Sequence, residues 1–196
     1  MKKYLNFNTL YIVMGIIAVS SFLIPQAIDI YHLQAQGINH IAEDAERYMN
    51  NAHTMEGDYT VTIDLIDPES NEGKSLFEDG EGNKIYVSKI VENESGYEVI
   101  FRSSGTYSRG GATLVSGIEH YRNINGYTHE LKAEAHATYN DDTFKLTPSS
   151  SSALHSLSGD EFGFYLFPPA IDVDLEKEST IEVTLTNLQL NLWAKF

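Results

Sequence analysis

Oxygen-bearing side chains recur between residues 67 and 78, a pattern that could hold a divalent cation. The candidate calcium ligands are Asp67, Glu69, Asn71 and Glu78. Ca²⁺ binds carboxylate and amide oxygens at alternate positions of a loop, with a closing carboxylate at the twelfth position, where Glu78 stands. However, Glu72 occupies the place where the EF-hand loop requires glycine, and the flanking segments have the pattern of strands. A weak divalent-ion site and a solvated loop between strands are the two interpretations.

The seven histidines are scattered along the chain and form no zinc motif. None lies in H-x-x-x-H or H-E-x-x-H, the spacings that bring zinc ligands together. His32 and His40 can share a helix face but have no third ligand nearby. His136 shares a strand face with Glu134, as an acid–base pair would require, whereas His129 sits on the opposite face. No serine stands in G-x-S-x-G or S-x-x-K, so we predict no catalytic residue and no cofactor.

Aromatic side chains crowd a short segment that precedes Pro168-Pro169. These residues are Phe162, Phe164, Tyr165 and Phe167. If they are exposed or line a cleft, they form a surface for a carbohydrate, lipid or protein partner. If they face inward, they belong to the hydrophobic core, which is the usual place for such a cluster.

The composition excludes several classes of function. Acidic residues outnumber basic ones 28 to 13, which gives a formal charge of −15 and disfavours nucleic-acid binding. An acidic surface keeps a protein soluble, or it can attract cations or a basic partner. The absence of cysteine removes disulfides, thiolate zinc sites and cysteine nucleophiles.

The N-terminal segment has the composition of a membrane-spanning helix. No charged residue occurs from Tyr4 to Ile28, and a spanning helix needs about 20 mostly apolar residues. Lys2 and Lys3 precede this run, so the positive-inside rule predicts a cytoplasmic N-terminus. We therefore expect residues 1–28 to form a cytoplasmic start and a single membrane span, with residues 5–28 in the membrane and the rest of the chain outside. The alternative is a cleaved signal peptide, which would leave a secreted or periplasmic protein.

Helical periodicity continues beyond the apolar run, through residues 29–56. Its apolar stripe includes Ile30, Gly37, Ile38, Ile41 and Ala45. We predict one long helix that is membrane-embedded at its start, amphipathic at its end, and finished soon after Asn50-Asn51. The stripe packs either on the protein's own sheet or on a neighbouring subunit, and the second case makes these five residues the candidate assembly interface.

Residues 57–196 alternate apolar and polar side chains with the period of β-strands. The predicted strands are Tyr59–Leu65, Lys84–Val91, Tyr97–Ser103, Ala112–Tyr121, Tyr127–Tyr139, Phe144–Thr147, Phe162–Phe167, Ile171–Leu175 and Thr180–Trp193. Asn125-Gly126 is expected at the centre of a type I′ hairpin turn, because both residues accept positive φ. The predicted fold class is mainly β with one long N-terminal α-helix and an antiparallel β-sandwich or jelly-roll-like domain.

The order of elements resembles that of pilin-like and TadE-like proteins of surface filaments. It consists of a short basic start, an apolar helix, an amphipathic continuation and then a sheet. The resemblance covers about the first 55 residues and is architectural, since no glycine precedes the apolar run as a prepilin-peptidase site. It implies a non-enzymatic subunit whose helix packs in the filament and whose β domain faces out. An anchored binding module built on the aromatic segment is the alternative function, and an extracytoplasmic hydrolase is the third. The expected partners are the membrane and other subunits, including copies of this chain.

Overall fold

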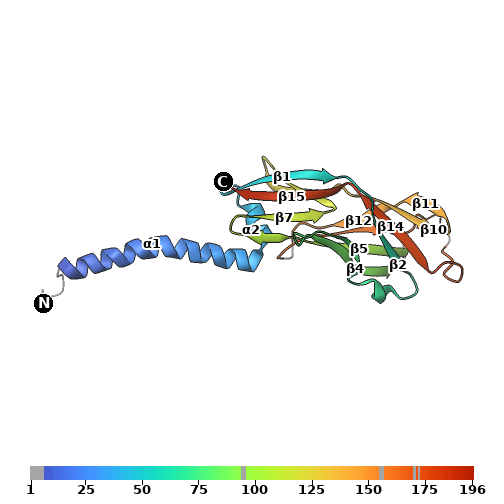
Figure 1. Cartoon of the computed structure of the whole chain (residues 1–196), viewed down its shortest axis with the longest axis horizontal. Helices are drawn as coiled ribbons and strands as arrows, with labels where there is room; N and C mark the ends of the chain where they lie inside the picture. Colours follow the sequence, from blue (N-terminus) through green and yellow to red (C-terminus); the bar gives the residue numbers. More distant parts are fainter. Residues whose placement is uncertain (1–6, 94–95, 155–156, 170, 172) are drawn as a thin grey trace.

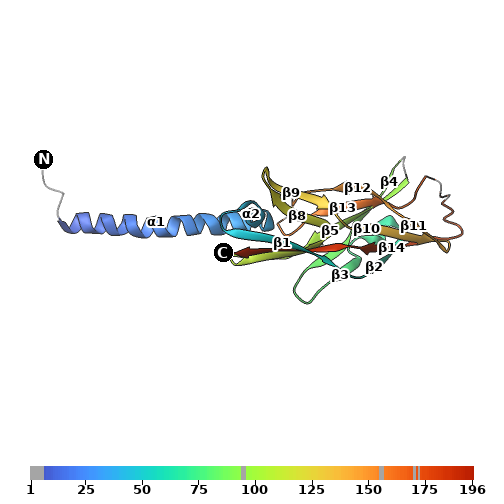
Figure 2. The same cartoon turned by 90° about the horizontal axis from the view of Figure 1, so that it is seen from above.

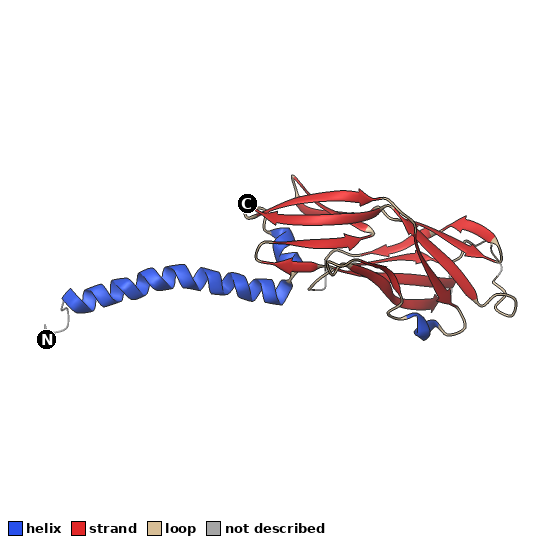
Figure 3. Cartoon of the chain, viewed as in Figure 1, coloured by secondary structure: helices blue, strands red, loops and turns tan. Residues whose placement is uncertain are grey.

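The computed structural model describes residues 7–93, 96–154, 157–169, 171 and 173–196. A long helix leaves one end of an elongated domain of antiparallel strands (Figure 1). This arrangement confirms the predicted class, mainly β with one long N-terminal helix and sandwich-like sheets. The colouring by secondary structure in Figure 3 shows that, within the described residues, helix is concentrated at the N-terminal end and strand in the domain.

Two helices come first in the chain. Helix α1 (Phe7–Gln36) continues through Pro25, and helix α2 (Ile38–Glu43) follows after a single residue. That residue, Gly37, has φ +57° and ψ −129°, a backbone conformation that side chains disfavour. A Cβ at this position would lie only 1.7 Å from the carbonyl oxygen of Leu157. Glycine therefore lets the chain turn sharply while its backbone touches the domain.

The helical prediction for residues 29–56 is correct only up to Glu43. Strand β1 (Tyr48–Met55) begins where the continuous helix was expected, and it pairs along its whole length with strand β15 (Leu188–Lys195). The apolar residues of this segment fit a helical stripe, but pairing with a strand 140 residues away satisfies its backbone groups instead. Long-range pairing overrides the local pattern here.

Together with β1 and β15, the other strands of the described residues form four antiparallel sheets. Their bounds are β2 (Tyr59–Asp64), β3 (Ser75–Glu78), β4 (Lys84–Asn93), β5 (Gly96–Ser104), β6 (Thr106–Ser108), β7 (Gly111–Ser116), β8 (Ile118–Asn123), β9 (Gly126–Leu131), β10 (Glu134–Tyr139), β11 (Asp142–Lys145), β12 (Thr147–Ser151), β13 (Glu161–Tyr165) and β14 (Thr180–Thr186), with a 3₁₀ turn η1 (Pro68–Asn71) after β2. The strand orders are β1-β15-β7-β6, β11-β10-β14-β2, β12-β13-β5-β4-β3 and β8-β9.

Two hydrophobic cores hold these layers together. The main core lies between the β11-β10-β14-β2 sheet and the β12-β13-β5-β4-β3 sheet, with fully buried side chains such as Ile181 on one side and Phe101 on the other. The second, which we call the helix core, joins the end of α1 and α2 to the β1-β15-β7-β6 sheet. The members of the helix core are Leu33, Ile38, Ile41, Ala42, Tyr48, Ala112, Leu114, Leu154 and Trp193. Both views place α2 beside this sheet, at the end from which α1 departs (Figures 1 and 2).

Several long predicted strands are divided because the chain passes from one sheet to another. Gly117 separates β7 from β8, and Asn187, with φ +57°, separates β14 from β15. The predicted strand 171–175 has no strand structure in its described residues, although Ile171, Val173 and Leu175 pack against the main core. A residue that turns the backbone allows a single apolar run to serve two sheets.

The predicted hairpin between β8 and β9 is present, but its turn differs. Asn123 pairs with Gly126, so Ile124 and Asn125 occupy the loop and only Gly126 has positive φ. A two-residue loop with positive φ at both positions occurs instead at Asn140-Asp141, between β10 and β11.

Candidate functional site

The joint between α1 and the domain is the first candidate site. Leu33, on the last turns of α1, is 9 % exposed, while Ile38 and Ile41 of α2 are fully buried in the helix core. The amide of Ile38 donates to the carbonyl of Leu157 at 2.8 Å, and the amide of Gly37 donates to the carbonyl of Leu33 at 2.9 Å. Apolar packing and backbone bonds therefore attach α1 to the domain without a flexible linker.

Charged side chains reinforce this joint. Asp29, on α1, has a side chain only 11 % exposed, and its Oδ1 accepts from Arg47 Nη1 at 2.6 Å. The same oxygen lies 3.1 Å from His40 Nε2 on α2. Arg47 also binds Asp44, in the turn that leads to β1. Arg47 thus links Asp29 of α1 to Asp44, in the turn between α2 and the first strand. Partial burial strengthens these bonds relative to exposed ion pairs.

A second arginine also binds the C-terminal end of α2. The guanidinium of Arg122, on β8, donates to the carbonyl of Ala42, one of the last carbonyls of the helix. A cation at a helix C-terminus satisfies an unpaired carbonyl and interacts favourably with the helix dipole. Tyr48 adds a bond from its hydroxyl to the carbonyl of Arg109 at 3.2 Å.

Beyond the joint, the apolar surface of α1 is not buried by any residue that the structure describes. Of the described residues, Phe7–Gln36 is the one helix long and apolar enough to cross a membrane, and its most apolar window is entirely unburied. A signal sequence meets the same criterion. The exposed large apolar side chains of α1 are Phe7, Leu10, Tyr11, Ile12, Val13, Met14, Ile16, Ile17, Val19, Phe22, Leu23, Ile24, Ile28, Ile30 and Tyr31.

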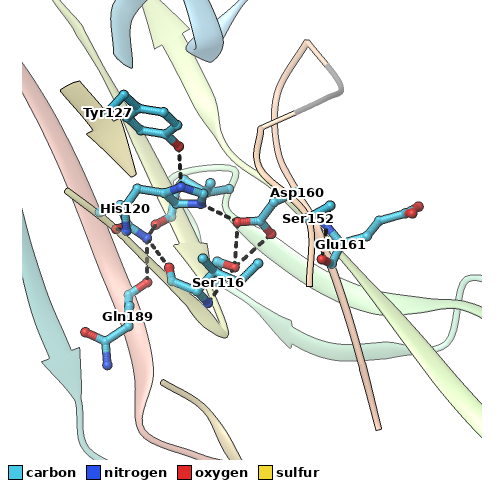
Figure 4. A network of polar contacts seen from close by, with 10 residues as sticks. Ser116, His120, Tyr127, Ser152, Asp160, Glu161 and Gln189 are labelled. Atoms are coloured by element: carbon cyan, nitrogen blue, oxygen red, sulfur yellow. Dashed lines mark hydrogen bonds and ion pairs between the residues drawn. The ribbon is translucent and has the colours of Figure 1, made fainter. Parts of the chain in front are cut away.

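A buried polar network is the second candidate site (Figure 4). Asp160 accepts from the Ser116 hydroxyl at 2.8 and 2.9 Å and lies 2.5 Å from His120 Nε2. Tyr127 places its hydroxyl against the other ring nitrogen of His120, and the two rings stack with centroids 5.8 Å apart. Asn191 accepts from the His120 amide at 2.8 Å. The network links β7, β8, β9 and β15 to the residue before β13.

The geometry of this network suits a structural role. Ser116, His120 and Asp160 are each 0 % exposed, so a substrate has no path to them. Asp160 stands between the serine and the histidine, so His120 is not placed to take the serine proton as in a nucleophilic triad. Burial, and then the negative charge of Asp160, raises the pKa of Tyr127, which keeps its hydroxyl protonated. A fully paired buried network of this kind specifies how the sheets meet.

Sequence reasoning missed this network because its members come from five segments: β7, β8, β9, β15 and the residue before β13. The one hint in the sequence was Gly117, a glycine directly beside the polar residue Ser116. A side chain at Gly117 would lie 2.7 Å from the ring of Phe162, so this position favours glycine next to Ser116. Such a signal indicates close packing but does not tell which distant polar groups meet.

The aromatic segment is not a ligand surface at its centre. Phe162 is 0 % exposed and Phe164 is 1 % exposed, both within the main core. Tyr165 is half-buried, and Phe167 packs edge-on against Tyr139 with ring centroids 5.2 Å apart. The prediction of a binding surface is therefore wrong for Phe162 and Phe164, because their alternate positions on β13 point into the sandwich.

The calcium candidates are used for local structure instead. Asp67 caps η1 by accepting from the amide of Ser70, while Asn71 is fully buried. The Asn71 Oδ1 accepts from the Asp64 amide at 2.8 Å and from Lys74 Nζ at 2.7 Å. Within the described residues no group of three or more acidic, histidine or cysteine side chains could hold a metal ion, so Asp67, Glu69 and Glu78 do not converge. A lysine ammonium occupies the place beside Asn71 where a cation was predicted.

The predicted assembly stripe divides into two parts. Gly37, Ile38 and Ile41 pack inside the domain, so their assignment to an intersubunit surface is wrong. Ile30 is 38 % exposed and Ala45 is also exposed. The protein's own sheet competes successfully for the amphipathic face because α2 turns back onto it at Gly37.

The histidines that were predicted to share an element differ in what they contact. His32 and His40 do meet, with stacked rings whose centroids lie 5.6 Å apart. Glu134 pairs with Lys145 at 3.0 Å, whereas His136 lies across from Lys145 in the strand register. Burial, followed by the neighbouring His120, lowers the pKa of His129.

Comparison with known proteins found no family model, no curated protein and no solved structure that matches this chain. The features of this chain that bear on function are the exposed helix α1 and the joint that fixes it to the domain.

Proposed function

We propose that this chain is a membrane-anchored structural protein that presents its β domain outside the cytoplasm and assembles with other subunits through α1. The observation that supports this proposal is the contrast between the two ends of α1. From Phe7 to Tyr31 it carries exposed apolar side chains, whereas Leu33, near its end, is buried in the helix core of the domain. A helix of this kind needs an apolar environment of its own.

The uncovered surface of α1 is too large for an isolated soluble protein. Covering each half-exposed aliphatic or aromatic side chain is worth on the order of 1 kcal/mol. Large contiguous apolar surfaces mark contacts with membranes or with other proteins. With 30 residues, α1 is about 45 Å long at 1.5 Å per residue, which exceeds the roughly 30 Å of a bilayer core. The helix is therefore long enough to span and still reach the domain.

The joint supports a structural role because it gives the domain a definite direction relative to the anchor. A glycine- or serine-rich linker would let the domain rotate freely. Here Asp29, Arg47 and His40 connect α1 to the domain by ion pairs, and Leu33 adds apolar packing. A fixed direction is what repeated contacts between identical subunits require. The assembly surface that remains is α1 itself, since much of the stripe beyond it is buried in the domain.

Deletion of residues 1–30 tests this proposal. The truncated protein keeps Leu33 and α2, so we expect a soluble, folded domain that has lost both membrane association and assembly. Circular dichroism and the fluorescence of Trp193, which is buried, report folding. Crosslinking in native membranes reports assembly. Unaltered assembly by the truncated protein would refute the proposal.

A replacement of residues 7–28 by an unrelated spanning helix is the matched control. This variant should stay in the membrane with an intact domain but lose crosslinking between copies. If it assembles like the natural chain, α1 serves only as an anchor and the subunit contacts lie in the β domain.

A further inference from the structure

We infer that the end of the domain around the joint is a second membrane contact, which rests on the interfacial layer of a phospholipid bilayer. This inference depends on the proposed anchoring by α1. The residues that form the contact are Tyr31, Met49 and Phe196, which we call the apolar collar. Lys195 precedes Phe196 in the chain.

The height of this end relative to the bilayer follows from the ion pairs of the joint. The charge-free run ends at Ile28, and Asp29 is the first charged residue, so the hydrocarbon boundary falls close to Asp29. Arg47 contacts Asp29 at 2.6 Å and therefore lies at the same level. The carbonyl of Arg47 accepts from the amide of Phe196 at 3.1 Å. Phe196 is thereby held at the boundary.

The collar side chains are far more exposed than the domain core. Tyr31 is 67 % exposed, Met49 is 59 % exposed and Phe196 is 77 % exposed. Met49 and Phe196 line one hollow of about 390 Å³, so they lie close together. In both Figure 1 and Figure 2 the C marker of the chain lies at the end of the domain from which α1 departs. Aromatic residues at this level are typical of membrane–water interfaces.

The charge of this end differs from that of the rest of the protein. Lys195 Nζ lies over the Tyr48 ring, 5.9 Å from its centroid, which places this cation at the joint. Arg47 pairs with Asp29 and Asp44, and the hollow lined by Met49 and Phe196 contains both Arg122 and Glu119. Cations and carboxylates are thus mixed at this end, whereas the whole chain carries −15. The collar can thus approach phospholipid headgroups without the repulsion that the strongly acidic remainder would cause.

A membrane contact explains why apolar side chains surround the foot of α1 on a domain that is otherwise strongly acidic. With the helix and the collar both in contact with lipid, the domain has two attachments instead of one, so it stands at a defined angle to the membrane. The partner is the bilayer rather than another subunit because the collar continues directly from the spanning segment at the same depth.

The absence of cysteine allows a direct test by single labels on the full chain. We would place a nitroxide at Met49→Cys or Phe196→Cys and reconstitute each protein in phosphatidylcholine vesicles. Electron paramagnetic resonance then compares collisions with oxygen, which dissolves in lipid, and with a water-soluble nickel chelate. At both positions we expect a several-fold higher ratio of oxygen to nickel accessibility than at the control Ile66→Cys. Ile66 is similarly exposed, at 66 %, but it follows β2, which belongs to a different sheet from β1 and β15, the strands next to the collar.

A fourth label, Val19→Cys, separates failure of the anchor from failure of the collar. Val19 is 57 % exposed in the middle of the apolar run and should report deep lipid. If the label at 19 is in lipid while those at 49 and 196 collide with nickel as readily as that at 66, the collar inference is refuted and the anchor stands. If labels at 49 and 196 are shielded from both reagents, another protein covers the collar and the inference is likewise refuted. If the label at 19 is in water, the anchoring itself fails.

Discussion

A single methyl group added at Gly37 should disrupt the joint. Gly37→Ala places a Cβ 1.7 Å from the carbonyl oxygen of Leu157, which is shorter than any real contact, so the two segments must separate. Separation removes the bond from the Ile38 amide to that carbonyl, which contributes about 1 kcal/mol. Alanine at φ +57° and ψ −129° adds backbone strain of about 1–3 kcal/mol. We therefore expect a loss of roughly 2–4 kcal/mol in the free energy of unfolding.

The assay is urea unfolding of the full chain in detergent micelles, followed by tryptophan fluorescence. Trp193 is the only tryptophan and lies in the helix core, 3 % exposed, so its emission reports the joint. With a urea dependence of about 2 kcal/mol per molar, the midpoint should fall by roughly 1–2 M. Amide hydrogen exchange of α2 should also become faster than in the natural protein.

The matched control is Gly15→Ala, in the exposed part of α1. Nothing lies within 4 Å of a Cβ built there, and alanine favours a helix over glycine, so the same substitution should not lower the midpoint. If Gly37→Ala unfolds at the midpoint of the natural protein, with unchanged exchange in α2, then the argument from backbone conformation and close approach is wrong.

Three further predictions concern the domain. In Asp160→Ala the buried Ser116 hydroxyl and the His120 ring lose their acceptor, so the free energy of unfolding should fall by about 3–5 kcal/mol. Asp160→Asn should cost less, and equal urea midpoints for the two variants would contradict this prediction. Partial burial raises the pKa of Asp79, but hydrogen bonds from Asn83 and nearby amides outweigh it and lower the pKa overall. The stability from Asp79 is therefore complete above the unfolded carboxyl pKa of about 3.9 and declines as pH falls through the folded value, so Asp79→Asn should flatten the acid limb of a thermal unfolding profile. Addition or chelation of calcium should leave the melting temperature unchanged, because Lys74 already occupies the Asn71 oxygen; a calcium-dependent rise would restore the cation site.

Local patterns were sufficient for the broad architecture. The run without charge from Tyr4 to Ile28 indicates a helix for an apolar environment, and the described part of this run, from Phe7 on, is one continuous helix. Alternation of side chains likewise predicts strands, as at Tyr59–Asp64, where Val61 and Ile63 face the core. Both inferences succeed because each depends on spacing between near neighbours, which a sequence states directly.

Long-range contacts decided the rest. Whether Ile38 and Ile41 meet their own sheet or another subunit depends on the turn at Gly37 and on the space beside Trp193, neither of which periodicity encodes. The same holds for His120 and Asp160, forty residues apart in sequence but 2.5 Å apart in space. Strand pairing depends on which distant segments can hydrogen-bond to each other's backbone groups. Side-chain burial depends on which distant segments can cover each other's apolar surfaces. The exposed α1 is therefore readable from the sequence, whereas the joint that directs it is a property of the folded domain.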